Sequence, residues 1–153
     1  AGMATTLSLG WFTPGWLYFA HVGDSRIYYL PAGGDRLKQL TADDTHVGWL
    51  FRNGMISEHQ ARTHPRRNVL QKALGGDNRY VEPQVGAVGC EPGDIFVFCT
   101  DGLTGGLFDH RLIDLLRQPP GADGDGNSAR VMVEESVRND GRDNATALVV
   151  RLR

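Results

Sequence analysis

The sequence predicts an α+β fold in which antiparallel strands come first and helices are added towards the C-terminal end. Within the first 40 residues, short segments rich in β-branched and aromatic residues alternate with turns that contain glycine or proline. Short turns of this kind join antiparallel strands, because parallel strands need a long crossover connection. Towards the C-terminus, two segments carry apolar residues three and four positions apart, which is the spacing of one helix face.

The expected strands are short and lie in two groups. In the first group, residues 16–22 and 26–30 are separated by a tight turn at 23–25, and residues 31–35 close a hairpin. Residues 94–99 in the second group are apolar after the first position, which predicts a strand buried on both faces. The complete set of expected strands is 5–12, 16–22, 26–30, 36–40, 85–88, 94–99 and 145–152.

Helices are expected in the middle and in the last third of the chain. Asp43 or Asp44 can cap a helix that ends near Gly54. Ser57 and Gln60 have the spacing of a capping box, which predicts that the next helix begins there. The expected helices after the first one cover 58–63, 109–117 and 129–138, and a flexible loop is expected at 119–127.

Size, charge and cysteine content narrow the class of protein. The 153 residues are the length of one domain, and 41% hydrophobic residues provide for a single core. A formal charge of −2 without a long basic run argues against binding to nucleic acid. No apolar stretch has the length that spans a bilayer, so no membrane association is expected. Cys90 and Cys99 lie in apolar segments and are expected to be buried free thiols in a reducing compartment, the cytoplasm.

Three aspartates share one kind of local setting. Asp24, Asp101 and Asp143 each lie at a strand end or a tight turn, next to small or turn-forming residues. If the sheets bring these ends together, the carboxylates would repel one another unless a hard divalent cation compensates their charge. Oxygen ligands favour Mg²⁺ or Mn²⁺ over Zn²⁺. Taken singly, an aspartate in a turn usually caps its own backbone, so the local pattern leaves both interpretations open.

Seven motifs follow one another in the order found in a known family. They are HVGDSR at 21–26, LTAD at 40–43, THPRRNVL at 63–70, ALG at 73–75, PGD at 92–94, TDGL at 100–103 and DNAT at 143–146. On these motifs the chain resembles the metal-dependent protein serine/threonine phosphatases of type 2C (the PPM family), in particular the compact bacterial members. The resemblance implies two antiparallel β-sheets packed as a sandwich and flanked by helices, in αββα layers.

The resemblance also implies an enzyme with a metal centre that hydrolyses phosphoserine and phosphothreonine in proteins. Family members hold two Mn²⁺ or Mg²⁺ ions, which activate a bridging water for attack on phosphorus. By motif match, Asp101 and Asp143 are expected to be metal ligands, and Asp24 is expected to help hold a third ion together with Asp101. Asn144 is expected to orient Asp143. Residues 43–74 match the family's flap, a mobile segment beside the active site that influences substrate access.

The chain departs from the family at its N-terminal side. The family's phosphate-binding arginine, a glutamate and the Asp-Gly-x-Gly-Gly segment have no counterpart, so residues 1–153 are expected to be the C-terminal two-thirds of a single phosphatase domain. Activity is then expected to be impaired unless a second chain supplies the missing strands, and an apolar sheet face is expected to be exposed. The alternative is a non-catalytic, phosphatase-like interaction or regulatory module.

Several other residues are of types that serve in substrate binding or catalysis. Arg66 and Arg67 could attract an anionic phosphoprotein substrate, such as a Ser/Thr kinase or its targets, although exposed loop arginines are usually only solvated. His64 is expected to be a structural hydrogen-bonding residue and not a general acid. Cys90 and Cys99 have no adjacent base that would make either thiol a nucleophile, which argues against a cysteine phosphatase.

Overall fold

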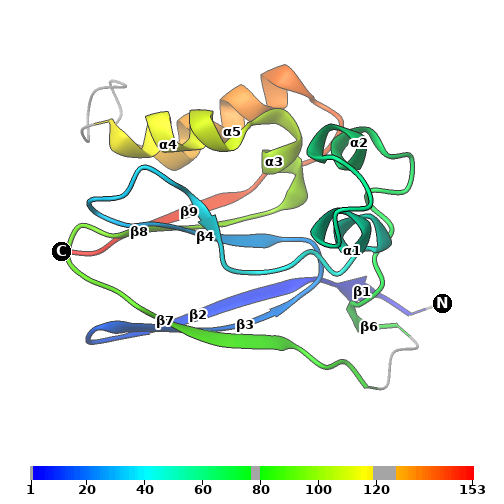
Figure 1. The fold of residues 1–153 in the computed structure, drawn as a ribbon, viewed down its shortest axis with the longest axis horizontal. Helices are drawn as coiled ribbons and strands as arrows, with labels where there is room; N and C mark the ends of the chain where they lie inside the picture. Colours follow the sequence, from blue (N-terminus) through cyan, green and yellow to red (C-terminus); the bar gives the residue numbers. More distant parts are fainter. Residues whose placement is uncertain (1, 77–79, 119–126) are drawn as a thin grey trace. The chain divides into compact units, whose positions relative to one another are not determined.

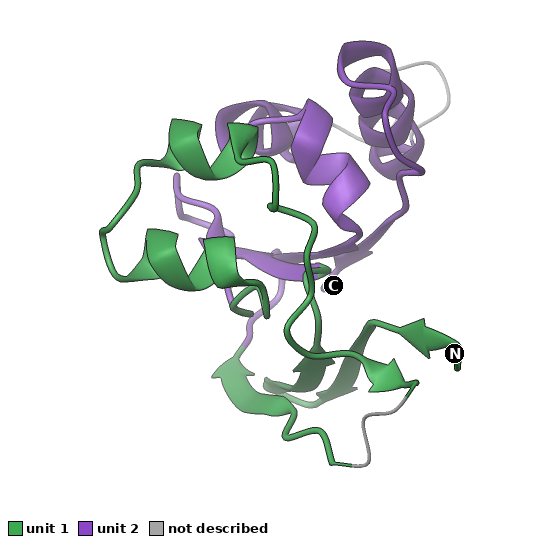
Figure 2. Cartoon of the chain, turned by 90° about the vertical axis from the view of Figure 1, so that its right-hand side faces the viewer, with its two compact units in different colours: residues 1–25, 41–89 green, residues 26–40, 90–153 purple. Residues whose placement is uncertain are grey.

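The computed structural model describes residues 2–76, 80–118 and 127–153. The described chain divides into two compact units, each built from two separate stretches of sequence (Figure 2). Unit 1 comprises Ala1–Ser25 and Thr41–Gly89, and unit 2 comprises Arg26–Leu40 and Cys90–Arg153. The loop expected at 119–127 lies outside the described residues except for its last position.

Unit 1 contains a three-stranded antiparallel sheet in the order β2-β3-β7. These strands are β2 (Leu7–Thr13), β3 (Trp16–Val22) and β7 (Gln84–Gly89). Strands β2 and β3 form a hairpin whose turn contains Gly15 at a φ of +79°, a conformation that glycine adopts at little cost. A second, two-stranded sheet pairs β1 (Ala4–Thr5) with β6 (Leu74–Gly75).

One face of the β2-β3-β7 sheet is apolar and exposed. Alternate residues of a strand lie on the same face, and in this sheet one such set is large and apolar. Trp11 on β2 and Tyr18 on β3 are register partners, and their ring centroids lie 6.0 Å apart. The exposed set also includes Leu7, Leu9, Trp16 and Val85, with exposed fractions from 46% to 73%. The exposed apolar sheet face expected from the sequence is therefore present.

Unit 1 also contains two short helices, α1 (His46–Arg52) and α2 (Glu58–Thr63). Helix α1 ends as expected, with Gly54 at a φ of +69° just after it. The expected cap at Asp43 or Asp44 is wrong: the hydroxyl of Thr45 accepts the hydrogen bond of the Gly48 N–H at 2.9 Å. The capping box predicted for α2 is confirmed, because Ser57 and Gln60 exchange both of its hydrogen bonds.

Unit 2 is an antiparallel sheet in the order β5-β4-β8-β9 with helices on one face (Figure 1). Its strands are β4 (Arg26–Leu30), β5 (Lys38–Gln39), β8 (Ile95–Cys99) and β9 (Ala147–Arg151). Its helices are α3 (Asp101–Gly106), α4 (Asp109–Arg117) and α5 (Ser128–Asn139). Buried strand residues such as Tyr28 and Val97 pack with helix residues such as Leu112 and Met132 in one hydrophobic core.

Further sequence expectations need correction. The turn at 23–25 does not join paired strands, because β3 belongs to the sheet of unit 1 and β4 to the sheet of unit 2. Helix α3 was not predicted, because its sequence DGLTGG contains three residues of the poorest helix former after proline. Strand β6 was not predicted, and the strand expected at 5–12 is divided into β1 and β2. The other strands and helices lie within a few residues of their expected bounds, and the α+β class is confirmed.

Candidate metal centre

Asp101 and Asp143 lie at the same end of the β8–β9 pair in unit 2. Asp101 follows β8 as the first residue of α3, and Asp143 precedes β9 by a few residues. Because β8 and β9 are antiparallel neighbours, the end of one strand lies beside the start of the other. Two further hydrogen bonds extend this pairing towards the aspartates: Thr100 N–H donates to the Thr146 carbonyl at 3.2 Å, and Thr146 N–H donates to the Thr100 hydroxyl at 3.0 Å.

The first turn of α3 packs directly on the backbone that follows Asp143. A Cβ atom added to Gly102 would collide with the carbonyl oxygen of Asn144, so only glycine permits this approach. From the other side, the buried hydroxyl of Ser136 on α5 lies within hydrogen-bonding distance of the carbonyls of Gly102 (2.8 Å) and Leu103 (3.0 Å). Helix α3 is thereby held between α5 and the loop that contains Asp143.

Asp143 is exposed, and its carboxylate is oriented by the next residue. The backbone N–H of Asn144 donates a hydrogen bond of 2.7 Å to Asp143 Oδ1. Asn144 thus contacts the Asp143 carboxylate through its backbone N–H. Asp101 is partly buried. The side-chain roles expected for Asn144 and for the two aspartates stay predictions.

Asp24 lies in unit 1, in the bend that follows β3. The preceding residue, Gly23, has a φ of +115°, and a Cβ atom at this position would collide with the side chain of Thr6. The Thr6 hydroxyl also lies 3.1 Å from the hydroxyl of Ser25 on the other side of Asp24. The chain conformation on both sides of Asp24 is therefore determined by local contacts, and glycine is required at position 23.

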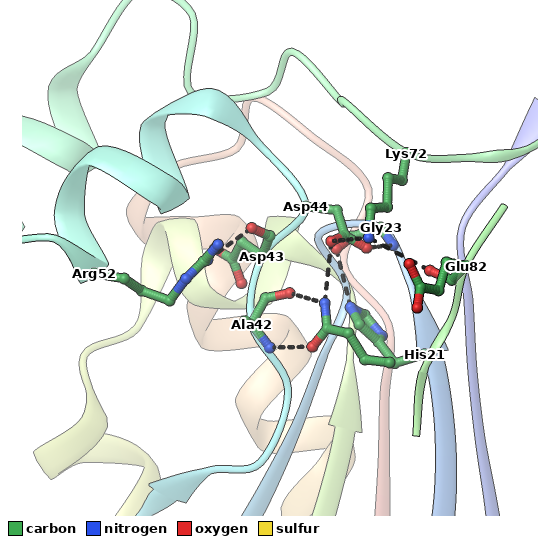
Figure 3. A network of polar contacts seen from close by, with 9 residues as sticks. His21, Gly23, Ala42, Asp43, Asp44, Arg52, Lys72 and Glu82 are labelled. Carbon is green, nitrogen blue, oxygen red and sulfur yellow. Dashed lines mark hydrogen bonds and ion pairs between the residues drawn. The ribbon is translucent and has the colours of Figure 1, made fainter. Parts of the chain in front are cut away.

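A buried polar network surrounds Gly23 (Figure 3). His21, which is 1% exposed, has its Nε2 2.9 Å from the Gly23 carbonyl and its Nδ1 2.8 Å from the Ser8 hydroxyl. A carbonyl only accepts, so Nε2 carries the proton and Nδ1 accepts from Ser8. Burial lowers the pKa of His21 below its ordinary value, more than the nearby charges of Asp44 and Asp43 raise it. The sequence predicted no role for His21 beyond its place at the start of the HVGDSR motif, because its hydrogen bonds depend on the pairing of β2 with β3.

Asp44 connects this network to residues 43–74, the segment that the resemblance predicts to be a flap. Its Oδ2 accepts from the Gly23 N–H at 3.0 Å, and its own N–H donates to the Gly23 carbonyl at 2.8 Å. Asp44 Oδ1 accepts from Gln84 Nε2 at 3.1 Å, and its backbone carbonyl accepts from the Gln71 N–H at 2.7 Å. The start and the end of the flap are thus joined to each other and to Gly23. An isolated antiparallel β-bridge between Thr45 and Leu70 also joins the two ends of this segment.

The basic part of the predicted flap follows α2. His64 Nδ1 accepts from the Arg66 N–H at 3.1 Å, and the His64 carbonyl accepts from the Arg67 N–H at 3.1 Å. His64 therefore has the structural role expected for it. Arg66 is exposed and Arg67 is partly buried. Their expected role in substrate binding stays a prediction.

The donor set of the three aspartates fits a hard divalent cation, because carboxylate oxygens are the ligands that Mg²⁺ and Mn²⁺ prefer. Within residues 2–76, 80–118 and 127–153, no group of three His, Cys, Asp or Glu side chains is close enough together to hold a metal. Asp24 belongs to unit 1, whereas Asp101 and Asp143 belong to unit 2. Convergence of the three carboxylates stays a prediction.

Comparison with known proteins gives a consistent result. No model of a protein family matches the chain. The serine/threonine protein phosphatase PstP of Mycobacterium tuberculosis is 36% identical over 97% of the chain, which spans 27% of that protein. The serine/threonine phosphatase stp of Listeria welshimeri is 35% identical over 97% of the chain, which spans 57% of it. The chain is a homologue of bacterial serine/threonine protein phosphatases.

Solved structures of such phosphatases match the fold. The M. tuberculosis phosphatase PstP/Ppp superposes with a TM-score of 0.83 at 34% identity, with 97% of this chain and 60% of that chain covered. The catalytic domain of PstP in complex with two manganese ions gives 0.82 at 33% identity, covering 98% and 59%. The PPM phosphatase MsPP of Mycobacterium smegmatis in complex with cacodylate gives 0.81 at 32% identity, covering 97% and 62%. The predicted resemblance to the PPM phosphatases is confirmed, and the chain spans less than two thirds of each of these relatives.

Two further observations concern the other sequence expectations. Cys90 and Cys99 are buried free cysteines, and burial raises the pKa of the Cys90 thiol, which keeps it protonated and poorly nucleophilic. None of the helices in the described parts of the chain combines the length and the apolar character that crossing a bilayer requires.

Proposed function

We propose that this chain is part of a metal-dependent protein phosphatase that hydrolyses phosphoserine and phosphothreonine. The observation that carries the proposal is the match, over 98% of the chain, to a phosphatase catalytic domain in complex with two manganese ions. In the hydrolysis, the oxygen of water bonds to phosphorus, and the bond between phosphorus and the Ser or Thr oxygen breaks. The proton that the water gives up is balanced by the proton that the Ser or Thr oxygen takes up. When bound, the two ions would supply an activated water and neutralise charge on the phosphoryl group.

In this proposal, Asp101 and Asp143 hold the ions and Asp24 helps to hold a third one together with Asp101. The support within unit 2 is the position of Asp101 and Asp143 at one end of β8 and β9, with the Gly102–Asn144 contact between their segments. Asn144 orients the Asp143 carboxylate through its N–H. The chain's own part in the reaction is thus to place oxygen ligands and to keep their geometry fixed.

The test is hydrolysis of p-nitrophenyl phosphate with Mn²⁺, with and without a chelator. We expect impaired but measurable Mn²⁺-dependent turnover, which Asp101→Asn or Asp143→Asn removes. Asp114→Asn is the matched control, because Asp114 is an exposed aspartate within α4. Turnover that persists in both Asp101→Asn and Asp143→Asn would contradict the proposed ligand set.

The second candidate is a non-catalytic, phosphatase-like interaction module. One observation favours it: an apolar face of the β2-β3-β7 sheet is exposed. In this second candidate function, another chain supplies further structural elements, and the module binds a partner without hydrolysing phosphate esters. Isothermal titration with Mn²⁺ separates the two candidates, since the module predicts neither Mn²⁺ binding nor hydrolysis.

The proposed substrates are phosphoproteins, among them a Ser/Thr kinase or its targets, in the cytoplasm. The two buried free cysteines are in keeping with a reducing compartment. Arg66 and Arg67 lie in the basic part of the flap and would attract the phosphate group. Replacing both by Ala is expected to raise KM for a phosphopeptide with kcat unchanged, whereas Arg138→Ala, an exposed arginine on α5, should change neither.

A further inference from the structure

Arg142 lies in the loop between α5 and β9, directly before Asp143. Its side chain is 73% exposed, and its Nε lies 3.1 Å from Asp140 Oδ1. Within the parts of the chain that the structure describes, this ion pair is the one polar contact of the guanidinium group. The two Nη groups of Arg142 are therefore open to a ligand from solvent.

Asp140, the partner of Arg142, is firmly placed. It is the C-cap residue of α5, and its N–H donates to the Ser136 carbonyl at 3.0 Å. Gly141 follows at a φ of +60°, which ends the helix and turns the chain towards β9. The Asp140 side chain is 26% exposed, and its Oδ2 lies 3.0 Å from the position that a Cβ atom of Gly105 on α3 would take. The ion pair thus fixes one edge of the guanidinium group against both helices.

The same ion pair keeps the guanidinium group of Arg142 away from the carboxylate that follows it. Asp143 accepts the Asn144 N–H at 2.7 Å, and among the described residues its carboxylate has no ion-pair partner. A guanidinium group paired with Asp143 would compete with a metal ion for the same oxygens, since both are cations. Because Asp140 holds Arg142 instead, the Asp143 carboxylate stays available to a metal ion.

An arginine that is held through Nε presents its Nη groups as a pair of donors. Phosphate oxygens accept such charge-assisted hydrogen bonds, and the planar guanidinium group matches their geometry. A phosphate group that approaches metal ions held by Asp143 comes to the same loop that carries Arg142. The loop therefore combines an oxygen ligand for a cation with a donor group for the anion that the cation attracts.

We propose that Arg142 binds the phosphate group of the phosphoserine or phosphothreonine substrate, and that Asp140 is its positioning residue. The proposal rests on the proposed function, because it takes Asp143 to be a metal ligand. Asp140 has two effects in it. It holds the guanidinium group in place for the phosphate, and it prevents this group from neutralising Asp143.

The test uses isothermal titration of O-phosphoserine into the Mn²⁺-loaded chain, with a parallel titration of Mn²⁺ alone. We expect Arg142→Ala to weaken phosphoserine binding about tenfold, the effect of losing a charge-assisted hydrogen bond, without lowering Mn²⁺ affinity. Arg142→Lys should recover only part of the loss, because lysine keeps the charge but not the planar pair of donors. Arg130→Ala is the matched control, since Arg130 forms an exposed ion pair with Glu134 in the first half of α5 and should change neither affinity.

Asp140→Asn supplies a readout that a merely structural role would not move. This variant releases the guanidinium group of Arg142, which can then pair with Asp143. We therefore expect Asp140→Asn to weaken the binding of both phosphoserine and Mn²⁺. In the double variant Asp140→Asn/Arg142→Ala, the competing cation is gone, and Mn²⁺ affinity should return towards that of the parent chain. Damage to the loop would not be repaired by removing a second side chain.

The possible failures are distinguishable. Phosphoserine binding that Arg142→Ala leaves unchanged, in a chain whose Mn²⁺ binding Asp143→Asn removes, would overturn the role of Arg142 and leave the proposed function intact. A chain that binds Mn²⁺ but not phosphoserine would have the same meaning. Mn²⁺ affinity that stays as low in the double variant as in Asp140→Asn, or that Asp140→Asn does not lower, would overturn the positioning role of Asp140. A chain that binds neither Mn²⁺ nor phosphoserine contradicts both proposals.

Discussion

Gly102 at the start of α3 lies against the carbonyl group of Asn144, with no room for a Cβ atom between them. The contact joins the segment that carries Asp101 to the segment that carries Asp143. Gly102→Ala must therefore push α3 away from the loop before β9, and we expect a loss of about 1–3 kcal/mol in the free energy of unfolding, as for other overpacked sites. Urea denaturation measures it. Gly33→Ala is the control, since Gly33 has open space around its Cβ position and should leave stability nearly unchanged.

The buried His21 predicts a loss of stability at mildly acidic pH. Burial lowers its pKa in the folded chain, whereas in the unfolded chain the pKa is near the ordinary value of 6.5. The unfolded chain therefore binds more protons, and the free energy of unfolding falls as the pH decreases below about 6.5 towards the lower folded pKa. His21→Gln, which does not titrate, should show a shallower decrease between about pH 7 and pH 5. An equal slope in both proteins would contradict this assignment.

Ser136 and Asn139 on α5 both contact backbone carbonyls of α3, but in different environments. The Ser136 hydroxyl is buried beside the carbonyls of Gly102 and Leu103, whereas Asn139 Nδ2 donates to the Gly106 carbonyl at an exposed position, at 2.9 Å. Removing a partner from a buried acceptor costs about 1–3 kcal/mol, and water replaces a partner that is exposed. We expect Ser136→Ala to lower the unfolding midpoint clearly more than Asn139→Ala does. Equal losses would contradict the argument.

Arg111 on α4 and Glu135 on α5 form a bidentate ion pair, with both N···O distances at 2.8 Å. The hydrogen bond from Arg111 lowers the pKa of Glu135. Solvent reaches the Arg111 side chain, so we expect a coupling energy of about 1 kcal/mol in a double-mutant cycle, at the upper end for accessible pairs. Arg130 and Glu134 form an ion pair four residues apart on α5, and both of its side chains are more exposed. The double-mutant cycle of this pair should give a coupling energy of about 0.3–0.5 kcal/mol. Comparable couplings for the two pairs would show that bidentate geometry adds nothing here.

Local sequence signals predicted the elements whose stabilising contacts are local. The capping box of Ser57 and Gln60 specifies α2, and a largely apolar segment between two turns specifies β3, because these signals act within a few residues. The candidate aspartates were also found from their settings at strand ends and turns. The position of Asp101 and Asp143 at one end of a strand pair follows from the β8–β9 register, which a local pattern does not contain.

The sequence by itself determined the α+β class, most strand and helix positions, and the resemblance to PPM phosphatases. The tertiary structure alone decided three features. Asp44 bonds to Gly23 and so leaves the cap of α1 to Thr45. The glycines of α3 serve close packing against Asn144 and Ser136, which compensates for their poor helix propensity. The third feature, the hydrogen bonding of buried His21 to Ser8 and Gly23, depends on the pairing of β2 with β3. In each case the stabilising contacts join residues that are distant in the sequence, so a local sequence pattern does not predict them.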